Sequence, residues 1–123
     1  MNALNQARRA YAAVATPVRT PRSTEFEAVA RITQKMQLAA DKGPGGFAAL
    51  AEALHDNRKL WDIFAIDVAD RENALSPELR ARIFYLAQFT HAHTRQVLAR
   101  KADVAPLLDI NKAILRGLRN GGA

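Results

Sequence analysis

The side chains with the clearest capacity for chemistry in this chain of 123 residues are its three histidines. Two of them, His91 and His93, form an H-x-H pair, which on a β-strand would place both imidazoles on one face, where they can bind a metal. On a helix, residues two apart point about 200° around the axis from each other and share no face. The chain has no cysteine, and no Asp or Glu stands near the pair at a suitable offset. We therefore expect no metal site, with His93 at the edge of the core and His91 exposed.

Motifs of known catalytic sites are also missing. The sequence contains no G-x-S-x-G elbow and no phosphate-binding P-loop. The glycine-rich run 43–46 precedes a predicted helix, whose N-terminus can hold an anion, but it lacks the Lys-Ser/Thr pair that binds a nucleotide and its magnesium. Asp67 and Asp70, three residues apart near a helix end, are typical of solvent-facing charge. The sequence therefore predicts a protein that is not an enzyme and uses no cofactor.

A third polar group lies in the run ALHDNRKLW, residues 53–61, which ends on the single tryptophan of the chain. On a helix, Leu54, Arg58 and Trp61 lie on one side, and Asn57 and Phe64 lie on the adjoining stripe. A charge between two large apolar residues is costly when it is buried alone. Arg58 is therefore expected to bond to carbonyl groups or to reach a carboxylate.

Two interpretations of this run remain open. In the first, Trp61 is a core anchor and Arg58 is a buried tie between helices, paired with carbonyls or with Glu25 or Asp62. In the second, Trp61 and Arg58 edge a groove for a partner helix, because Trp and Arg are over-represented at interface hot spots. The two can hold together, and we expect Asn57, Arg58 and Trp61 to serve architecture first and recognition second.

Composition limits the class of protein. Hydrophobic residues make up 49% and charged residues 24% of the chain, which predicts one globular domain over 1–123. The net charge of +6 favours nucleic acid, anionic membranes or acidic partners, but no basic run is longer than two residues, which is typical of a solvated surface. The apolar run after the two arginines at 8 and 9 is too short for a signal peptide, and no stretch approaches the roughly 18 residues of a membrane span.

Apolar periodicity predicts helices throughout the chain and no strand. The fold class is therefore all-α, a small single-domain bundle of about five helices. Residues 1–20 form an N-terminal helix and a proline-containing linker, and residues 22–120 form the helical core. The expected elements are a helix over 2–15, an extended linker over 16–22, helices over 24–41 and 47–69, a fourth helix from 77 to near 103, and a last helix opened near 106.

Capping residues mark several of these ends. Thr24, with Glu27 three residues later, forms a capping box. Ser76 caps the fourth helix, with Pro77 at its first position. The glycines and proline of 41–46 predict a flexible turn. The inward stripes are Phe26, Val29, Ala30, Thr33 and Met36; Phe47, Leu50, Ala51, Leu54, Trp61, Ala65 and Val68; Leu79, Ile83, Leu86, Ala87, Thr90, Thr94 and Val97; and Leu107, Ile110, Ile114 and Leu118.

Four motifs in register resemble the FlaF family of flagellar proteins from alphaproteobacteria. They are TPRSTEF (20–26), LHDNRKLW (54–61), ENALSPELRA (72–81) and LLDINKAILRGL (107–118), and the similarity covers residues 11–118. The resemblance implies a non-enzymatic, cytoplasmic factor for flagellum biogenesis. It implies flagellin as a partner, bound by its terminal helices in the manner of a secretion chaperone, and joint action with FlbT, a regulator that restrains flagellin translation.

Two sets of residues are expected to carry these roles. The set expected to contact a partner is Phe47, Asn57, Arg58, Trp61, Phe64 and Asn111. The set expected to form structural motifs is Pro21, Arg22, Glu25, Asn73, Pro77 and Arg80.

A chaperone of amphipathic helices would offer a groove that accepts residues at i, i+3, i+4 and i+7. We expect this groove between the first helix and the surface that bears Phe47, Trp61 and the last helix. The alternative function is direct binding of flagellin messenger RNA, for which the net charge is the motive. The sequence has no RNP-type aromatic strand, no GXXG loop and no arginine-rich tract, so nucleic acid is the less favoured partner.

Overall fold

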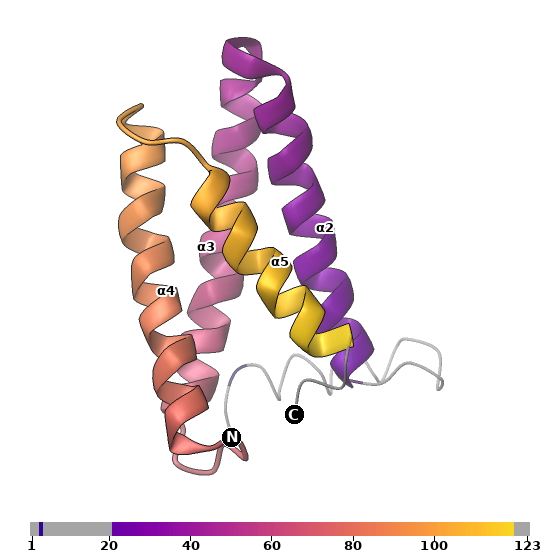
Figure 1. Ribbon diagram of the computed structural model, residues 1–123, viewed down its shortest axis with the longest axis vertical. Coiled ribbons are helices and arrows are strands. Elements are labelled where there is room, and N and C mark those ends of the chain that lie inside the picture. Colours follow the sequence, from indigo (N-terminus) through magenta and orange to yellow (C-terminus); the bar gives the residue numbers. More distant parts are fainter. Residues whose placement is uncertain (1–2, 4–20, 120–123) are drawn as a thin grey trace.

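The computed structural model describes Ala3 and residues 21–119 of the chain. Within them the elements follow in the order α2 (Pro21–Asp41), the 3-10 helix η1 (Gly43–Gly46), α3 (Phe47–Ala69), α4 (Pro77–Leu98) and α5 (Ala105–Arg119), with no strand in this part (Figure 1). The all-α class is therefore confirmed, and the described part holds four α-helices where about five were predicted for the whole chain. The helix expected over 2–15 lies, apart from Ala3, outside the described residues, as does the linker up to residue 20.

Helix α2 begins at Pro21, three residues before the start predicted at Thr24. Residues 21 and 22 are therefore helical rather than extended, and Thr24 lies inside the helix instead of at its N-cap. The proline explains the difference. Its fixed φ suits the first helical turn, where its missing amide hydrogen removes no intrahelical bond.

Three helices lie roughly along the long axis of the molecule, and α5 crosses them obliquely (Figure 1). Helices α2 and α3 are antiparallel and joined through η1, and α4 returns antiparallel beside α3. Helix α5 leaves the upper end of α4 and runs across α3 to the lower end of α2, on which it packs. Helix α3 therefore separates α2 from α4, and the side of α4 that faces away from α3 and α5 stays at the surface.

The turn between α2 and α3 depends on two of its glycines. Gly43 has a φ of 67°, in the left-handed region that other residues rarely adopt. Gly46 is buried against the end of α2, where a β-carbon would collide with the carbonyl oxygen of Ala39. The turn predicted over 41–46 is present, and it takes the form of a 3-10 helix.

The core lies between α2, α3 and α5, with the last turns of α4 closing one side. Trp61 is completely buried, which confirms that the single tryptophan is a core anchor. Residues of α4 nearer its start are only half-buried, although the same stripe runs through them: Leu79, Ile83 and Leu86. The buried apolar cluster comprises Val29, Ile32, Met36, Ala53, Leu54, Leu60, Val97, Val104, Leu107 and Leu108.

Candidate functional site

A chain of hydrogen bonds between buried polar side chains joins three helices at the centre of the core. Asn111 of α5 accepts a hydrogen bond at Oδ1 from Trp61 Nε1 of α3, at 3.0 Å. Its Nδ2 donates to Asn57 Oδ1 of α3 at 2.9 Å and to Thr33 Oγ1 of α2 at 3.1 Å. The Thr33 hydroxyl donates in turn to the carbonyl oxygen of Val29, at 2.6 Å. We call these four side chains, Thr33, Asn57, Trp61 and Asn111, the polar network.

The polar network sets the position of α5 on the other two helices. Its members are between 0% and 5% exposed, so water does not replace a lost partner. Leaving one buried donor or acceptor unpaired costs about 1–3 kcal/mol. A shift of α5 by one turn would leave Asn111, Asn57 and the indole N–H unpaired together, and this penalty selects one register.

The structure divides the residues predicted to contact a partner into two groups. Asn57, Trp61 and Asn111 meet in the polar network, where they present no surface to another molecule in this fold. The remaining residues, Phe47, Arg58 and Phe64, are half-buried at the edge of the core. The Phe64 ring stands edge-on to the Trp61 indole, with centroids 5.2 Å apart and an angle of 86° between the planes.

Phe47 is the first residue of α3, and its ring packs against Arg100, two residues after the end of α4. The guanidinium carbon of Arg100 is 4.2 Å from the centre of the Phe47 ring. Arg100 has a φ of 61° and donates its N–H to Val97 O, while the N–H of Lys101 donates to Gln96 O, each at 2.9 Å. This is the Schellman pattern of a helix end, in which glycine usually holds the left-handed position. The arginine closes the end of α4 against the start of α3.

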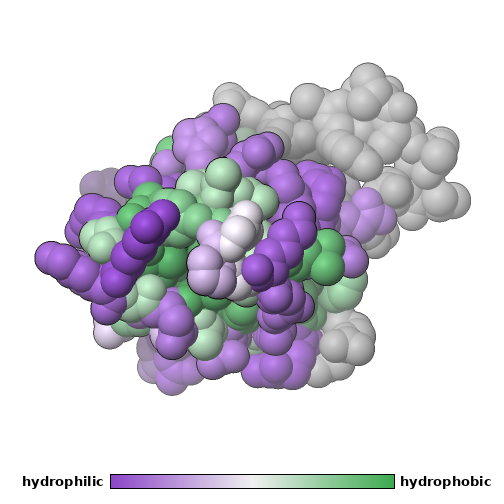
Figure 2. Space-filling view, turned by 90° about the horizontal axis from the view of Figure 1, so that it is seen from above, coloured by the Kyte–Doolittle hydropathy of each residue, from purple (hydrophilic) through white to green (hydrophobic). Residues whose placement is uncertain are grey.

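Figure 2 looks onto this end of the bundle and shows an apolar centre surrounded by polar and charged residues. The large apolar side chains that stay exposed in the described part of the chain are Leu38, Ile66, Phe84 and Tyr85. Of these, Leu38 lies near the end of α2, which leads through η1 into α3.

Arg58 is not the buried tie that its position predicted. It is half-buried and makes no hydrogen bond or ion pair within the described residues. Asp62, one of its two expected partners, instead places Oδ1 2.8 Å from Nε2 of His91 on α4. The physical reason is the length of the arginine, whose stem can cover apolar surface while its charge stays in water, at less cost than a buried ion pair. Asn57, one residue earlier, provides the polar tie.

The two histidines of α4, His91 and His93, make their contacts on different sides of the helix. His91 is half-buried rather than exposed, because it meets Asp62 of α3. The ring of His93 stacks on Phe89, with centroids 5.4 Å apart, and its Nε2 lies 2.8 Å from the carbonyl oxygen of Asp103. In the part of the chain that the structure describes, no three His, Cys, Asp or Glu side chains gather as metal ligands would.

The connection between α3 and α4 is held by two residues of the predicted structural set. Asn73 Nδ2 donates to the backbone oxygen and to Oδ2 of Asp67, at 3.0 and 3.1 Å. Arg80 donates from Nε to Val68 O at 2.8 Å and from Nη2 to Asp70 O at 3.0 Å. These carbonyls at the end of α3 have no intrahelical partner, so Arg80 caps that helix. Asp67, predicted to face solvent, is buried because the connection folds over it.

The remaining members of the structural set lie at helix starts. Ser76 Oγ accepts a hydrogen bond from the N–H of Leu79 at 3.2 Å, which confirms the predicted N-cap, and Pro77 is the first residue of α4. Pro21 begins α2, and Glu25 is half-buried in its early turns. The side chain of Arg22 lies outside the described residues.

A surface ion pair links α2 to α3. Lys35 Nζ lies 2.8 Å from Asp56 Oδ2, and the two side chains are 44% and 35% exposed. The hydrogen bond from Lys35 lowers the pKa of the Asp56 carboxyl, and the same bond raises the pKa of Lys35. Because water reaches both groups, salt screens this interaction.

Two of the exposed large apolar side chains named above line a single hollow, and a third lies on α3, the helix beside it. Ile66 of α3 is 53% exposed, and Phe84 and Tyr85 of α4 are 42% and 59% exposed. We call Ile66, Phe84 and Tyr85, together with the hollow that Phe84 and Tyr85 line, the α3–α4 apolar surface. The hollow measures about 420 Å³ and is lined by Val68, Ala69, Pro77, Arg80, Ala81, Phe84, Tyr85 and Gln88.

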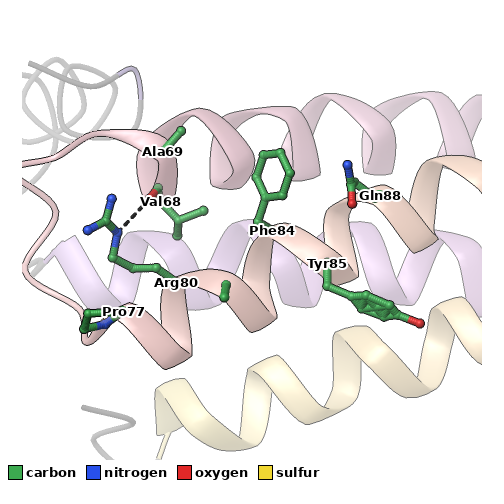
Figure 3. A pocket seen from close by; sticks show the side chains of 8 residues that line it. Val68, Ala69, Pro77, Arg80, Phe84, Tyr85 and Gln88 are labelled. Carbon is green, nitrogen blue, oxygen red and sulfur yellow. Dashed lines mark hydrogen bonds between the residues drawn. The ribbon is translucent and has the colours of Figure 1, made fainter.

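The positions of the neighbours explain why these side chains lie together. In Figure 3, Arg80 lies at the end near the helix connection, Phe84 stands in the middle, and Gln88 follows along α4. On α3, Ile66 follows Asp62 by one helical turn and precedes Ala69 by one turn, so the three share a side of the helix. Asp62 meets His91 of α4 and Ala69 lines the hollow, so this side of α3 faces α4. Sequence reasoning missed this surface because it followed the inward stripe. The available signal was that Phe84 and Tyr85 fall off that stripe, where large apolar groups have no core to enter.

Residues 7–118 match the family model described as "Flagellar protein FlaF". The chain belongs to the FlaF family of flagellar proteins. This match confirms the resemblance drawn from the four motifs, and it covers all four described α-helices apart from Arg119, the last residue of α5. No curated protein and no solved structure matches the chain.

The motifs that carry the FlaF resemblance are used largely inside the fold. Asn57 comes from LHDNRKLW and Asn111 from LLDINKAILRGL, and their side chains bond to each other in the polar network. Asn73 and Arg80 come from ENALSPELRA and hold the connection between α3 and α4. Among the described helices of this FlaF-family chain, none is both long and apolar enough to cross a membrane.

Proposed function

We propose that this FlaF-family protein binds flagellin in the cytoplasm before export, as a secretion chaperone, and regulates flagellin synthesis together with FlbT. Membership of a flagellar protein family supports a role connected with the flagellum. The observation that carries the proposal is the α3–α4 apolar surface, where Phe84 and Tyr85 are exposed beside one hollow and Ile66 is exposed on the neighbouring α3. Exposed apolar clusters of this kind mark interaction sites in soluble proteins.

The amphipathic ends of flagellin are suited to binding at such a surface. The terminal regions of flagellin are amphipathic and pair with each other in the filament, so their apolar faces would aggregate before export. A seam between two helices can accept the apolar face of a third helix through anchors at i, i+3, i+4 and i+7. Release must also be easy, and polar groups at the rim of a contact favour reversible binding. Gln88 and Arg80 supply such groups at the two ends of the hollow.

The residues first expected to contact a partner take two roles in this proposal. Asn57, Trp61 and Asn111 support flagellin handling by holding α2, α3 and α5 together. Phe47, Arg58 and Phe64 keep part of their side chains at the surface and stay predictions as contact residues. The groove expected beside the first helix involves residues outside those described.

The test is complex formation with monomeric flagellin. The purified protein should co-elute with full-length flagellin monomer in size-exclusion chromatography and should not co-elute with flagellin that lacks its helical ends. Unchanged binding to the shortened flagellin would refute capture of those ends. Failure to bind full-length flagellin would contradict the chaperone function itself.

Titration with flagellin messenger RNA at two salt concentrations checks the alternative. Binding driven by the net charge of +6 would weaken steeply with salt, because it depends on counterion release. Capture of an apolar helix face depends much less on salt. Tight, steeply salt-dependent RNA binding without flagellin binding would replace the proposal with translational control at the messenger.

A further inference from the structure

The hollow in the α3–α4 apolar surface has a cation at one end. Arg80 is half-buried in its lining and donates two hydrogen bonds, both to neutral carbonyl oxygens, those of Val68 and Asp70. A guanidinium has five N–H donors, so three of them have no acceptor among the described residues. In this part of the chain, no carboxylate lies within ion-pair distance of Arg80.

The two acidic residues at the end of α3, where Arg80 binds the backbone carbonyls, are engaged within the connection. Asp70 Oδ1 accepts the N–H of Glu72 at 2.9 Å, and Asp67 Oδ2 accepts from Asn73 at 3.1 Å. The carbonyl end of α3 carries a partial negative charge that offsets part of the charge on Arg80. It does not supply the paired, charge-assisted hydrogen bonds that a carboxylate makes with a guanidinium.

The groups along the hollow follow a fixed order. Phe84 lies four residues after Arg80, about 6 Å further along the helix axis, and Gln88 lies one turn beyond it (Figure 3). Ala69 and Ala81 also line the hollow, and their small side chains leave room for an apolar group. The order is therefore cation, apolar space and neutral amide.

From this order we infer that the hollow receives one helix of a protein partner, which carries an Asp or Glu one turn away from a large apolar side chain. The apolar side chain fills the hollow beside Phe84, and the carboxylate pairs with Arg80. This inference rests on the proposed function and names the chemistry by which flagellin's helical ends would be recognised there.

A second copy of this chain fits the hollow less well. In a twofold, antiparallel contact of α4 centred on Phe84, Arg80 of one copy would face residue 88 of the other. Gln88 stands at that position, so the contact would offer Arg80 an amide and no carboxylate. Charge complementarity therefore favours a partner of different sequence.

The first part of the test addresses the apolar anchor. Flagellin monomer is titrated against the wild type, Phe84→Ser and Leu38→Ser. Leu38→Ser is the matched control, because Leu38 is an exposed large apolar residue away from this surface. Phe84→Ser should weaken binding about tenfold or more, as truncation of an interface anchor does, and Leu38→Ser should stay within about twofold of the wild type.

The second part addresses the charge. Arg80→Gln should weaken flagellin binding and remove most of its salt dependence, whereas Arg80→Lys should retain that dependence. Arg82→Gln is the control, because Arg82 is an exposed arginine two residues away on another side of α4 and should behave as the wild type. Circular dichroism melting of each variant shows whether the α3–α4 connection is intact, and variants are compared below their melting temperatures.

The outcomes separate the site from the function. If the wild type binds flagellin and Phe84→Ser binds equally well, the site is wrong and the proposed function stands. If Phe84→Ser weakens binding but Arg80→Gln keeps both affinity and salt dependence, the carboxylate pairing is wrong. Absence of wild-type binding overturns the proposed function and this inference with it. A dimer of the free protein that Phe84→Ser dissolves would assign the surface to a second copy instead.

Discussion

Asn111 makes hydrogen bonds to side chains of two other helices, and all of its partners are buried. An amide suits this position because it offers acceptor and donor atoms together, without the charge that an aspartate would bring into the core. Asn57 is less completely paired, since its Nδ2 has no hydrogen-bond partner among the described groups. At the scale of residues, the stability of this fold therefore depends on one well-satisfied amide and one partly satisfied amide.

Trp61 gives the first prediction. Replacement by Ala removes the largest fully buried side chain and should cost about 3–5 kcal/mol of the roughly 5–15 kcal/mol that stabilises a domain of this size. Replacement by Phe keeps much of the volume but leaves Asn111 Oδ1 without its indole donor, and should cost about 1–3 kcal/mol. Urea unfolding followed by circular dichroism measures both values. A near-neutral Trp61→Ala would contradict the buried position of the indole.

A double-mutant cycle on the two amides gives the second prediction. Asn111→Leu leaves the Trp61 N–H and Asn57 Oδ1 unpaired. Asn57→Leu removes one of the two acceptors of the Asn111 amide group and so leaves one N–H unpaired. Asn111→Leu should therefore destabilise more than Asn57→Leu, each by at least about 1 kcal/mol. The double variant should cost less than the sum by about 0.5–3 kcal/mol, because the second change removes a group already unpaired. Strict additivity would show that the two amides do not interact.

At the scale of elements, helix ends were more predictable than contacts between helices. Ser76 and Pro77 define the start of α4 by local chemistry, and the structure agrees. The start of α2 was misjudged because two local signals competed, and Pro21 prevailed over the Thr24 capping box. The pairing of Asn57 with Asn111 spans 54 residues, and helical periodicity does not encode which polar residues on different helices will meet. The same limit explains why the prediction that Arg58 is a buried tie between helices was wrong, and why the α3–α4 apolar surface was not predicted.

The ion pair between α2 and α3 gives a prediction about pH. The folded pKa of Asp56 is lowered, chiefly by the hydrogen bond from Lys35, below an unfolded value of about 3.9. The stability that Asp56 adds is therefore present above that value and is lost as pH falls through the folded pKa. The pKa of Lys35 is raised. The stability that Lys35 adds is therefore present below its unfolded pKa and is lost as pH rises through its folded pKa.

Carboxyl chemical shifts from NMR titration measure this effect. Lys35→Met should return the pKa of Asp56 toward its ordinary value, and added salt should shift it in the same direction in the wild type. Lys59→Met is the control, since Lys59 is the weakest of the contributors to the lowered pKa, and it should have a smaller effect. An Asp56 pKa that Lys35→Met leaves unchanged would refute the assignment.

At the scale of the whole molecule, α3 divides the described part of the chain into two regions, to which the proposed function assigns different roles. Helices α2 and α5 pack on one side, where the polar network joins them to α3. Helix α4 packs on the other side, and its early turns share with α3 the exposed apolar side chains. Family membership and the all-α class followed from sequence motifs and periodicity. The division into a packed side and a proposed binding side required the structure, because it depends on which side chains the fold leaves uncovered.

Measuring melting temperature and flagellin affinity together on Asn111→Leu and Phe84→Ser tests this division most directly. The account predicts that Asn111→Leu melts earlier but, while still folded, binds flagellin monomer within about twofold of the wild type, because Asn111 presents no surface to a partner. It predicts that Phe84→Ser melts close to the wild type and binds about tenfold or more weakly. Normal melting with abolished binding in Asn111→Leu, or unchanged binding in Phe84→Ser, would contradict the account.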